Sequence, residues 1–508
     1  MLTEKDIDQI EAHGLTLHKV YKQLETFSRG IPFANVITTA SLGNGIQAIN
    51  DDAQKGLENY YDSKKDELDV VKFVPASGAA TRMFKFLHEF LDNFDPEKDV
   101  FRTYVKNNPS QDLEAFFSSL SDFAFVNEVR KKVREMYPDY KKSSKGKRYY
   151  CFANAMLSKK GLNFGDKPKG LIPFHRYKKY ATTAFEEQLI EAAGYAAVKD
   201  DVYLHFTFSE KHVESFKDEF NAVRSRVSRK TKKTYHISYS FQNKDTDSIA
   251  VTPDNKPVRD KKGGLIFRPS GHGALLHNLN EVNADVVFIK NIDNVAAQEY
   301  NTEIGCYKKV LGGKLLQLQS KIFGYLKKLQ GEVTLDEVKE IQSFIWNDLD
   351  VKDIPHGISA MIEFLDRPLR VCGVVRNTGA PGGGPFWVKN SEGQVSLQIV
   401  EKSQIDVGNE RQQGIVNEAT HFNPVDIVCG LRNYKGEKFD LMQFADPHTG
   451  IIAEKSENGK PIKALELPGL WNGGMAHWNT IFVEVPLITF NPVKTVNDLL
   501  KKEHRPNA

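Results

Sequence analysis

The chain has 508 residues, of which 40% are hydrophobic and 27% are charged. This length exceeds one ordinary hydrophobic core, so we expect two or three domains or one large decorated domain. The 69 basic residues are nearly balanced by 66 acidic ones, and the formal net charge is only +3. Composition therefore gives no electrostatic reason to expect nucleic acid as a partner.

The cysteines and the N-terminus indicate a cytoplasmic protein. Four cysteines, Cys151, Cys306, Cys372 and Cys429, are scattered without any Cys-x-x-Cys spacing, which is typical of reduced core residues. The charged N-terminal stretch is not typical of a signal peptide. Because no apolar run approaches the roughly 20 residues that span a bilayer, we expect no membrane partner.

The first part of the chain, residues 1–68, is predicted to be a helical segment. Thr3 and Asp6 can form a capping box, and the apolar residues that follow keep a helix-like spacing. Residues 95–165 are charged and predicted to be helical as well. They contain a basic run at 141–148, for which a solvated loop is the expected structure and phosphate contact the alternative.

Strand and helix patterns alternate through the middle of the chain. Strands or extended pieces are predicted at 70–74, 170–174, 202–208, 235–241 and 286–289, with helices at 81–91, 181–193, 211–226 and 274–282. This alternation indicates crossover connections and a mostly parallel sheet. Helix is predicted again over 299–349, and strands over 370–376, 395–400 and 480–488.

A turn of small residues after the strand at 70–74 is the first candidate phosphate site. Ala76, Ser77 and Gly78 can present backbone N–H groups to an anion. The helix that follows begins with Thr-Arg, so its dipole and the Arg82 guanidinium add to the attraction. The alternative is an ordinary strand–helix turn with an exposed arginine.

Two further segments carry single candidate residues for nucleotide binding. Lys167 and Lys169 lie on either side of a proline and can present positive charge rigidly to a triphosphate, although most surface lysines have no such role. Gln242, directly after a predicted strand, can read a base through its amide. A solvated glutamine is the commoner case.

The most informative stretch is residues 269–295. Gly271 allows backbone to approach a flat base or sugar, and His272 can hydrogen-bond a ligand. A fully apolar strand then ends shortly before Asp293, a position from which a carboxylate can hold a divalent metal against phosphates. The alternative is a simple turn in which Asn and Asp side chains bond the backbone.

Three late residues complete the set of candidates. Glu401 and Asn423 supply the carboxylate and the amide that a site for sugar hydroxyls needs. Lys494 follows a Phe-Asn-Pro-Val sequence and can neutralise the charge of a transferring phosphate.

In their order along the chain, these elements resemble the eukaryotic-type UDP-sugar pyrophosphorylase superfamily. The superfamily loop Leu-x-Gly-Gly-x-Gly-Thr-Arg is similar to residues 75–82, and its Pro-Lys-Gly element matches residues 168–170. Its Pro-x-Gly-His/Asn-Gly turn matches residues 269–273, and its Asn-x-Asp-Asn sequence includes Asp293. The late Pro-Val-Lys-Thr falls on residues 492–495. The likeness covers the chain from about residue 70 to the end and is greatest to a bacterial branch of the superfamily.

The resemblance implies a Rossmann-like α/β fold with a mixed, mostly parallel sheet of the nucleotide-diphosphosugar transferase type. Its core would span residues 69–430, with a helical insertion at about 95–165, and residues 431–508 would complete the site for the sugar phosphate. The activity implied is that of a nucleotidyltransferase that uses Mg²⁺. It would join a nucleoside triphosphate, with UTP as first choice, to a sugar 1-phosphate and release pyrophosphate.

The resemblance also implies a role for each candidate residue. The expected roles are catalysis for Arg82, Lys169 and Lys494, metal binding for Asp293, nucleotide binding for Ala76, Ser77, Gly78, Gln242 and Gly271, and sugar binding for His272, Glu401 and Asn423.

Several features depart from the superfamily pattern and leave two alternatives open. Ser77 and Ala80 replace two loop glycines, about 80 residues separate this loop from Lys169, and no C-terminal β-helix of hexapeptide repeats follows. One alternative is a glycosyltransferase on the same fold, for which Asp245-Thr-Asp247 has the metal-motif spacing but lies in a polar stretch. The other is a non-catalytic nucleotide-sugar-binding protein, suggested by the altered loop.

Overall fold

The computed structural model describes residues 2–76, 80–379, 382–457 and 459–506, with the side chain of His272 left out. The chain forms two compact units, each built from separate segments. Unit 1 comprises Met1–Phe73, Ser240–Ile289 and Tyr307–Leu487, and unit 2 comprises Val74–Tyr239, Lys290–Cys306 and Ile488–Ala508. This division follows contacts rather than chain order, and the three-part division expected along the sequence stays a prediction.

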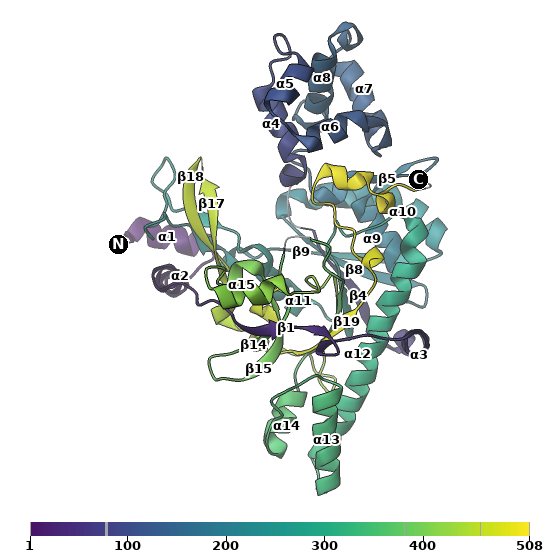
Figure 1. Ribbon diagram of the computed structural model, residues 1–508, viewed down its shortest axis with the longest axis vertical. Helices are drawn as coiled ribbons and strands as arrows, with labels where there is room; N and C mark the ends of the chain where they lie inside the picture. The colour runs from purple at the N-terminus through teal and green to yellow at the C-terminus, as the bar shows by residue number, and fades with distance from the viewer. Residues whose placement is uncertain (1, 77–79, 380–381, 458, 507–508) are drawn as a thin grey trace. The chain divides into compact units, whose positions relative to one another are not determined.

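A mixed sheet forms the centre of unit 1, in the strand order β2-β3-β19-β13-β16-β12-β4 (Figure 1). Most neighbours in this order are parallel, whereas β16 is antiparallel to both β13 and β12. The predicted α/β class with a mixed, mostly parallel sheet is therefore confirmed. The strands are β2 (Ser41–Leu42), β3 (Gly45–Gln47), β4 (Val70–Pro75), β12 (Val286–Ile289), β13 (Leu369–Val374), β16 (Asp426–Gly430) and β19 (Asn479–Glu484).

Both faces of this sheet are covered, which explains why its central strands are apolar throughout. On one face, Val287 and Ile289 of β12 join a core cluster with Leu275 and Leu279 of helix α11. On the other face the long helix α12 packs closely, and a Cβ at its Gly312 would lie 3.1 Å from the ring of Phe288. Alternate residues of one strand thus serve two separate cores.

The remaining elements of unit 1 are smaller sheets and the helices around them. The antiparallel sheet β1-β14-β15 and the pairs β10-β11 and β17-β18 lie outside the central sheet. These strands are β1 (Asn35–Thr39), β10 (Ser248–Ile249), β11 (Phe267–Arg268), β14 (Gly384–Lys389), β15 (Val395–Val400), β17 (Ile451–Glu457) and β18 (Lys460–Glu466). The helices are α1 (Glu4–His13), α2 (Leu17–Arg29), α3 (Asp51–Lys64), α11 (Leu275–Glu281), most of α12 (Asn301–Leu329), α13 (Leu335–Asn347), α14 (Ile358–Leu365) and α15 (Glu410–Asn417).

Unit 2 contains a short β-structure and a group of helices. Strand β8 pairs with β7 and β9, and β5 pairs with β6 in a hairpin. The strands are β5 (Pro173–Arg176), β6 (Ala181–Thr183), β7 (Ala197–Val198), β8 (Asp201–Phe208) and β9 (Thr234–Phe241). The helices are α4 (Lys85–Asn93), α5 (Phe101–Asn107), α6 (Gln111–Ser118), α7 (Val126–Met136), α8 (Lys145–Leu157), α9 (Ala184–Ala192) and α10 (Val213–Thr231).

Helices α4 to α8 share one aromatic core, so the predicted helical structure of residues 95–165 is confirmed. Phe116 and Phe90 are among its fully buried residues. The basic run differs from the expected loop, because helix α8 begins at Lys145 with Ser144 as its N-cap. Serine at this position accepts a hydrogen bond from the Lys147 N–H, which satisfies one of the free donors of the first turn.

The N-terminal segment contains more than the helices expected from its spacing. The Thr3–Asp6 capping box at the start of α1 is confirmed. Residues 35–47, however, form strands β1, β2 and β3. The partners of β1 and β3, in β14 and β19, lie more than 300 residues away, whereas β2 pairs with β3. Short strands whose partners are distant in sequence have little local sequence pattern by which they could be predicted. Within the described part of the chain, no helix combines the length and the apolar character that crossing a membrane requires.

We predict that Gly313 is required for the packing of α12 in unit 1. A Cβ at this position would lie 2.1 Å from the carbonyl oxygen of Leu57 in α3. Backbone on both sides leaves no room to adjust, so Gly313→Ala should lower the free energy of unfolding by about 2 kcal/mol or more. Gly324 on the same helix has open space around it. Gly324→Ala should therefore raise stability by up to about 1 kcal/mol through helix propensity.

Chemical denaturation of the two variants checks this prediction. Equal unfolding free energies for Gly313→Ala and Gly324→Ala would show that α12 does not pack on α3 as described.

Candidate active site

The Lys169 ammonium is the centre of the candidate site and lies in unit 2. Its Nζ donates to Asp293 Oδ2 at 2.8 Å and to the carbonyl oxygen of Val493 at 2.8 Å. The two side chains are 22% and 18% exposed, so the pair is accessible but partly shielded from water. Three of the predicted segments, at 168–170, 291–294 and 492–495, therefore meet around one cation.

The segment that carries Asp293 is fixed on both sides. The Ile292 N–H donates to the Pro75 carbonyl, and the Val493 N–H donates to the Asp293 carbonyl. Asn294 extends this anchoring, because its side chain accepts from the Asn491 N–H and donates to the Thr489 carbonyl. The carboxylate thus projects from backbone that is bonded to the end of β4 and to the C-terminal segment.

Gly170 explains why the Pro-Lys-Gly element contains a glycine. A Cβ at Gly170 would lie 2.9 Å from Cγ1 of Ile292 and 3.2 Å from the ring of Phe216. The missing side chain lets the Lys169 backbone approach the Asp293 segment closely enough for the 2.8 Å bond. Pro168 before it keeps the chain extended at the start of the 3₁₀ turn Lys169–Leu171.

The small-residue loop after β4 is held close to the same region of the chain. Ala76 is buried, and its N–H donates to the Thr207 carbonyl. The Ala80 N–H donates to the Lys167 carbonyl at 2.9 Å, two residues before Lys169. Arg82 is exposed in the 3₁₀ helix Ala80–Phe84. The predicted phosphate-binding residues Ser77 and Gly78 lie outside the described residues.

Lys494 follows directly after the carbonyl that Lys169 binds. Val493 is fully buried, whereas Lys494 is exposed. The Lys494 and Thr495 N–H groups both donate to Asp498 Oδ2 at 2.9 and 2.7 Å, which fixes the backbone at this point. The structure therefore brings the Lys494 backbone next to the Lys169–Asp293 pair.

Two of the predicted nucleotide-binding residues contact each other in unit 1. Gln242 Nε2 donates to the Gly271 carbonyl at 3.0 Å. Gly271 has φ of +64°, a left-handed conformation that favours glycine. The amide predicted to read a base is thus held against the turn that was predicted to let the base approach. The His272 side chain lies outside the described part of the structure.

Two of the three predicted sugar-binding residues, Glu401 and Asn423, flank one glycine segment, also in unit 1. A Cβ at Gly383 would lie 2.7 Å from Cα of Glu401, and one at Gly384 would lie 3.0 Å from the carbonyl of His421, two residues before Asn423. Asn423 Oδ1 is buried and has no hydrogen-bond partner within the described ranges. An unpartnered buried acceptor is costly, which makes this amide available to a ligand donor.

The described candidates therefore divide between the two units. Unit 2 carries Ala76, Arg82, Lys169, Asp293 and Lys494, and unit 1 carries Gln242, Gly271, Glu401 and Asn423.

Among the candidate residues of unit 2, Asp293 is the one that could bind a divalent cation. Only one of its carboxylate oxygens is bonded to Lys169, and the described residues provide no donor for Oδ1. Mg²⁺ commonly takes one or two carboxylates and completes its shell with water and substrate phosphates. Among the described residues no group of three or more His, Cys, Asp or Glu side chains forms a cage, so substrate and water would have to supply the remaining ligands.

The Asp-x-Asp sequence at 245–247, considered above as a metal motif, makes structural hydrogen bonds inside unit 1. Asp247 accepts from His13 Nε2 at 2.9 Å and is largely buried, and this burial raises the pKa of its carboxyl. The Asp245 carbonyl accepts from Lys19. Both residues thereby attach helices α1 and α2 to the rest of the unit.

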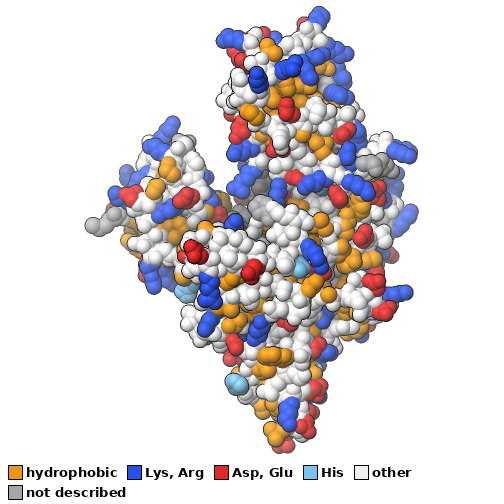
Figure 2. Space-filling model, viewed as in Figure 1, with side chains coloured by type: hydrophobic (Ala, Val, Ile, Leu, Met, Phe, Trp, Pro, Cys, Tyr) orange, Lys and Arg blue, Asp and Glu red, His pale blue; other side chains and the backbone are white. Residues whose placement is uncertain are grey.

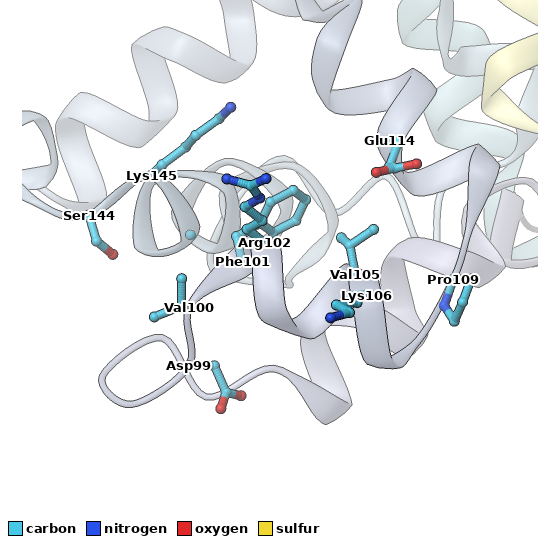
Figure 3. Close-up of a pocket in the computed structure, with 11 residues that line it drawn as sticks. Asp99, Val100, Phe101, Arg102, Val105, Lys106, Pro109, Glu114, Ser144 and Lys145 are labelled. Atoms are coloured by element: carbon cyan, nitrogen blue, oxygen red, sulfur yellow. The ribbon is translucent and has the colours of Figure 1, made fainter.

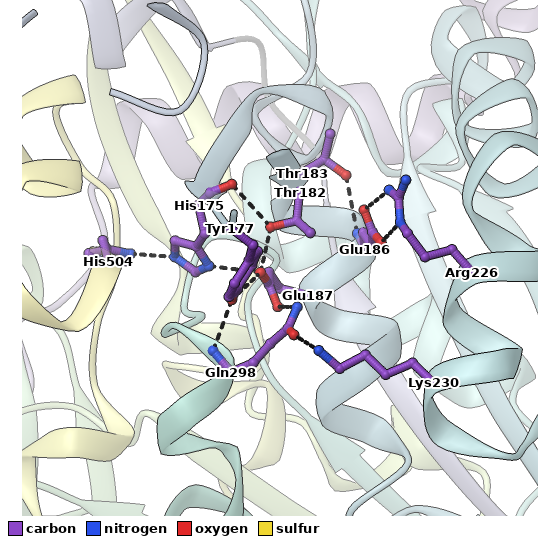
Figure 4. Close-up of polar contacts among 10 residues, drawn as sticks. All are labelled: His175, Tyr177, Thr182, Thr183, Glu186, Glu187, Arg226, Lys230, Gln298 and His504. Carbon is purple, nitrogen blue, oxygen red and sulfur yellow. Dashed lines mark hydrogen bonds and ion pairs between the residues drawn. The ribbon is translucent and has the colours of Figure 1, made fainter. Parts of the chain in front are cut away.

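A buried polar network in unit 2 was missed by sequence reasoning (Figure 4). Glu187 on α9 accepts from His175 Nδ1 at 2.9 Å, Tyr177 Oη at 2.9 Å and Thr182 Oγ1, and from Gln298 Nε2 at 3.0 Å. The available signal was the presence of three glutamates, Glu186, Glu187 and Glu191, in an otherwise largely apolar helix. Three of its partners lie within 12 residues of it in sequence, but Gln298 is 111 residues away and carries no local mark of this contact.

The network continues from His175 to His504, and its successive hydrogen bonds indicate which ring nitrogens carry protons. His175 Nε2 lies 3.0 Å from His504 Nδ1. Because Nδ1 of His175 donates to the Glu187 carboxylate, we assign its Nε2 as acceptor and His504 Nδ1–H as donor. His504 Nε2 is then a buried lone pair, which matches its lack of a partner among the described residues.

This network supports the site because its members come from the segments that carry the site. His175 lies shortly after Lys169, Gln298 shortly after Asp293, and His504 in the C-terminal segment that contains Lys494. Gln188, next to Glu187, donates to the Asn291 carbonyl at 2.9 Å. Buried hydrogen bonds of this kind fix the relative positions of the segments that meet at Lys169.

The chain belongs to the family described as a domain of unknown function, DUF4301, whose model matches residues 3–505. No curated protein matches the sequence significantly.

Several solved structures are similar to this fold. A UDP-N-acetylglucosamine pyrophosphorylase from Trypanosoma brucei aligns with a TM-score of 0.49 and 11% identity, over 95% of this chain and 74% of that one. A UDP-glucose pyrophosphorylase from Leishmania major aligns with a TM-score of 0.47 and 13% identity, over 100% and 80%. These neighbours are UDP-sugar pyrophosphorylases, the superfamily that the sequence motifs resemble.

We predict that His504 makes stability depend on pH. Burial lowers the pKa of its imidazole from 6.5 to about 3 in the folded chain, and His175 acts in the same direction. The unfolded chain therefore takes up a proton near pH 6.5 that the folded chain does not, and stability present above this pH is lost as pH falls towards 3. One such proton corresponds to about 2 kcal/mol between pH 7 and pH 5.

Urea denaturation at pH 7 and pH 5 measures this effect against His504→Gln, which keeps a donor but does not titrate. The native chain should lose about 2 kcal/mol more than the variant over this range. Identical losses would contradict the neutral His504 assigned above.

Proposed function

We propose that this chain is a nucleotidyltransferase that joins a nucleoside triphosphate and a sugar 1-phosphate, with UTP as the first candidate nucleotide. The products are a nucleotide sugar and pyrophosphate. The observation that carries the proposal is the Lys169–Asp293 pair, which is held against the backbone immediately before Lys494. Two cationic side chains and one carboxylate, far apart in sequence, thus belong to one small region of unit 2.

The reaction needs positioning and charge neutralisation rather than a covalent intermediate. A phosphate oxygen of the sugar 1-phosphate attacks the α-phosphorus of the triphosphate in line. The bond from that phosphorus to the bridging oxygen breaks, and its electron pair leaves with pyrophosphate. Fixed cations around such a transfer stabilise the charge that develops on the phosphoryl oxygens.

Each residue of unit 2 has a role in this scheme. Lys169 exchanges one of its present acceptors for a phosphate oxygen, and Arg82 grips the triphosphate from the loop that follows β4. Lys494 neutralises the sugar phosphate. Asp293 would hold Mg²⁺, which when bound neutralises the α-phosphate and orients the triphosphate.

The residues of unit 1 supply selectivity in this proposal. Gln242 and Gly271 select the base, with the amide already bonded to the turn. Glu401 and Asn423 orient the sugar hydroxyls, and the unpartnered Asn423 Oδ1 is the acceptor for one of them. His272 lies in the same turn and would contact the sugar.

The glycosyltransferase alternative receives no comparable support. It would use an Asp-x-Asp metal motif, and the Asp247 carboxylate is already bonded to His13. A non-catalytic nucleotide-sugar-binding protein differs from the transferase in a measurable way: it would bind UTP or a nucleotide sugar without releasing pyrophosphate.

We predict that Asp293→Asn removes turnover while the fold is kept. Pyrophosphate release is measured with UTP, Mg²⁺ and a panel of sugar 1-phosphates, and the variant should be slower by at least about 100-fold because the metal loses its charged ligand. The thermal unfolding midpoint should change little, since asparagine can still accept the Lys169 hydrogen bond.

Glu299→Gln is the matched control, because it removes an exposed carboxylate six residues away. It should keep the native rate. Equal rates for Asp293→Asn and the native chain would remove the metal assignment. Saturable binding of UTP without pyrophosphate from any sugar phosphate would favour the non-catalytic alternative.

A further inference from the structure

A pocket of about 770 Å³ lies in the helical insertion of unit 2, away from the Lys169–Asp293 pair (Figure 3). It is formed by the segment from Asp99 through α5 to Pro109, by Glu114 of α6, and by the start of α8. Its size is within the range of pockets that bind small organic molecules. None of its lining residues belongs to the proposed transferase site.

The floor of the pocket is apolar, and its central residue Phe101 is firmly packed. Val100, Phe101, Val105 and Pro109 provide its carbon surface. The Phe101 ring lies 4.9 Å from the ring of Tyr149 and also contacts aromatic rings of the insertion core. Because Phe101 is held from behind, the pocket is present before any ligand binds, and binding need not order the side chain first.

Gly146 creates the space between α5 and α8. A Cβ at this position would lie 2.6 Å from the Phe94 ring and 3.3 Å from Cβ of Phe101. The glycine therefore lets the first turn of α8 come close to the aromatic floor. As a result, the Lys145 side chain reaches the edge of the pocket.

The edge of the pocket carries more positive than negative charge. Arg102, Lys106 and Lys145 line it, and in the described ranges none of the three has an acidic partner within ion-pair distance. Glu114 and Asp99 also line it, but Asp99 Oδ2 is engaged by the Asp95 N–H at 2.8 Å. Figure 3 shows Arg102 and Phe101 in the middle of the lining, between Lys145 and Glu114.

The helical segment around the pocket also carries an excess of positive charge. Basic residues outnumber acidic ones in residues 95–165, although the whole chain is nearly balanced. Figure 2 shows Lys and Arg side chains interspersed with hydrophobic ones over the part that Figure 1 labels α4 to α8. An apolar floor with cations at its edge that have no acidic partner among the described residues is complementary to a ligand that has an apolar body and a negatively charged end.

We propose that this pocket binds a small organic anion whose aliphatic chain covers the apolar floor and whose carboxylate is held by Arg102 and Lys145. Neither part of the ligand suffices by itself. A bare anion would meet exposed cations in water, where ion pairs contribute little, and a cationic chain would be repelled.

Decanoate is the test probe, titrated into the full chain by isothermal titration calorimetry. Acetate carries the same head without the chain, and decyltrimethylammonium carries the chain with the opposite charge. Decanoate should bind with 1:1 stoichiometry, and the two comparison molecules should bind at least about tenfold more weakly. Equal affinity for decyltrimethylammonium, or no saturable binding of decanoate, would overturn the proposal.

Three variants of lining residues and one control variant locate the binding. Arg102→Gln and Lys145→Gln should each weaken decanoate binding about fivefold or more, whereas Lys131→Gln, which removes an exposed cation outside the pocket lining, should not. Val100→Asp adds a negative charge to the lining at the N-cap of α5, where aspartate favours the helix. It should abolish binding without lowering the unfolding midpoint. Decanoate affinities that match the native chain in all three lining variants would place the anion elsewhere and overturn the proposal.

Discussion

One lysine connects the parts of unit 2 on which the candidate site depends. The Lys169 Nζ bonds a carboxylate 124 residues away and a backbone carbonyl 324 residues away, both at 2.8 Å. A buried or partly buried ammonium is stable only when such acceptors satisfy it, so these contacts constrain three segments at once. Gly170 permits the approach, and the hydrogen bonds of Asn294 and Asp498 keep the two partner segments in place.

Behind this pair, unit 2 has a second layer of polar contacts. Glu187 receives four donors from two parts of the chain, residues 175–182 and Gln298, and the hydrogen bond from His175 to His504 reaches the C-terminal segment. None of these network residues is itself a candidate site residue. They are linked to the site through residues that are close to them in sequence. Their role is to position the elements that carry Lys169, Asp293 and Lys494, which is what a transfer reaction without a covalent intermediate requires.

Much of the fold and of the segments that carry Lys169 and Asp293 could be predicted from the sequence, because their signals were local. β12 was predicted with its observed bounds, since four consecutive apolar residues between turns are typical of a strand covered on both faces. The short strands between residues 35 and 47 and the network around Glu187 could not be predicted in this way. Strands β1 and β3 depend on partners that are distant in sequence, and the network is completed by Gln298 and His504, which carry no local mark of their partners.

The proposed transferase activity requires the Lys169–Asp293 pair to receive the triphosphate and its metal. A crystal structure with uridine 5′-(α,β-imido)triphosphate and Mg²⁺ tests it most directly. We expect a phosphate oxygen within hydrogen-bond distance of Lys169 Nζ and the metal bound to a carboxylate oxygen of Asp293. An ordered nucleotide bound elsewhere, with the Lys169–Asp293 bond unchanged, would contradict it.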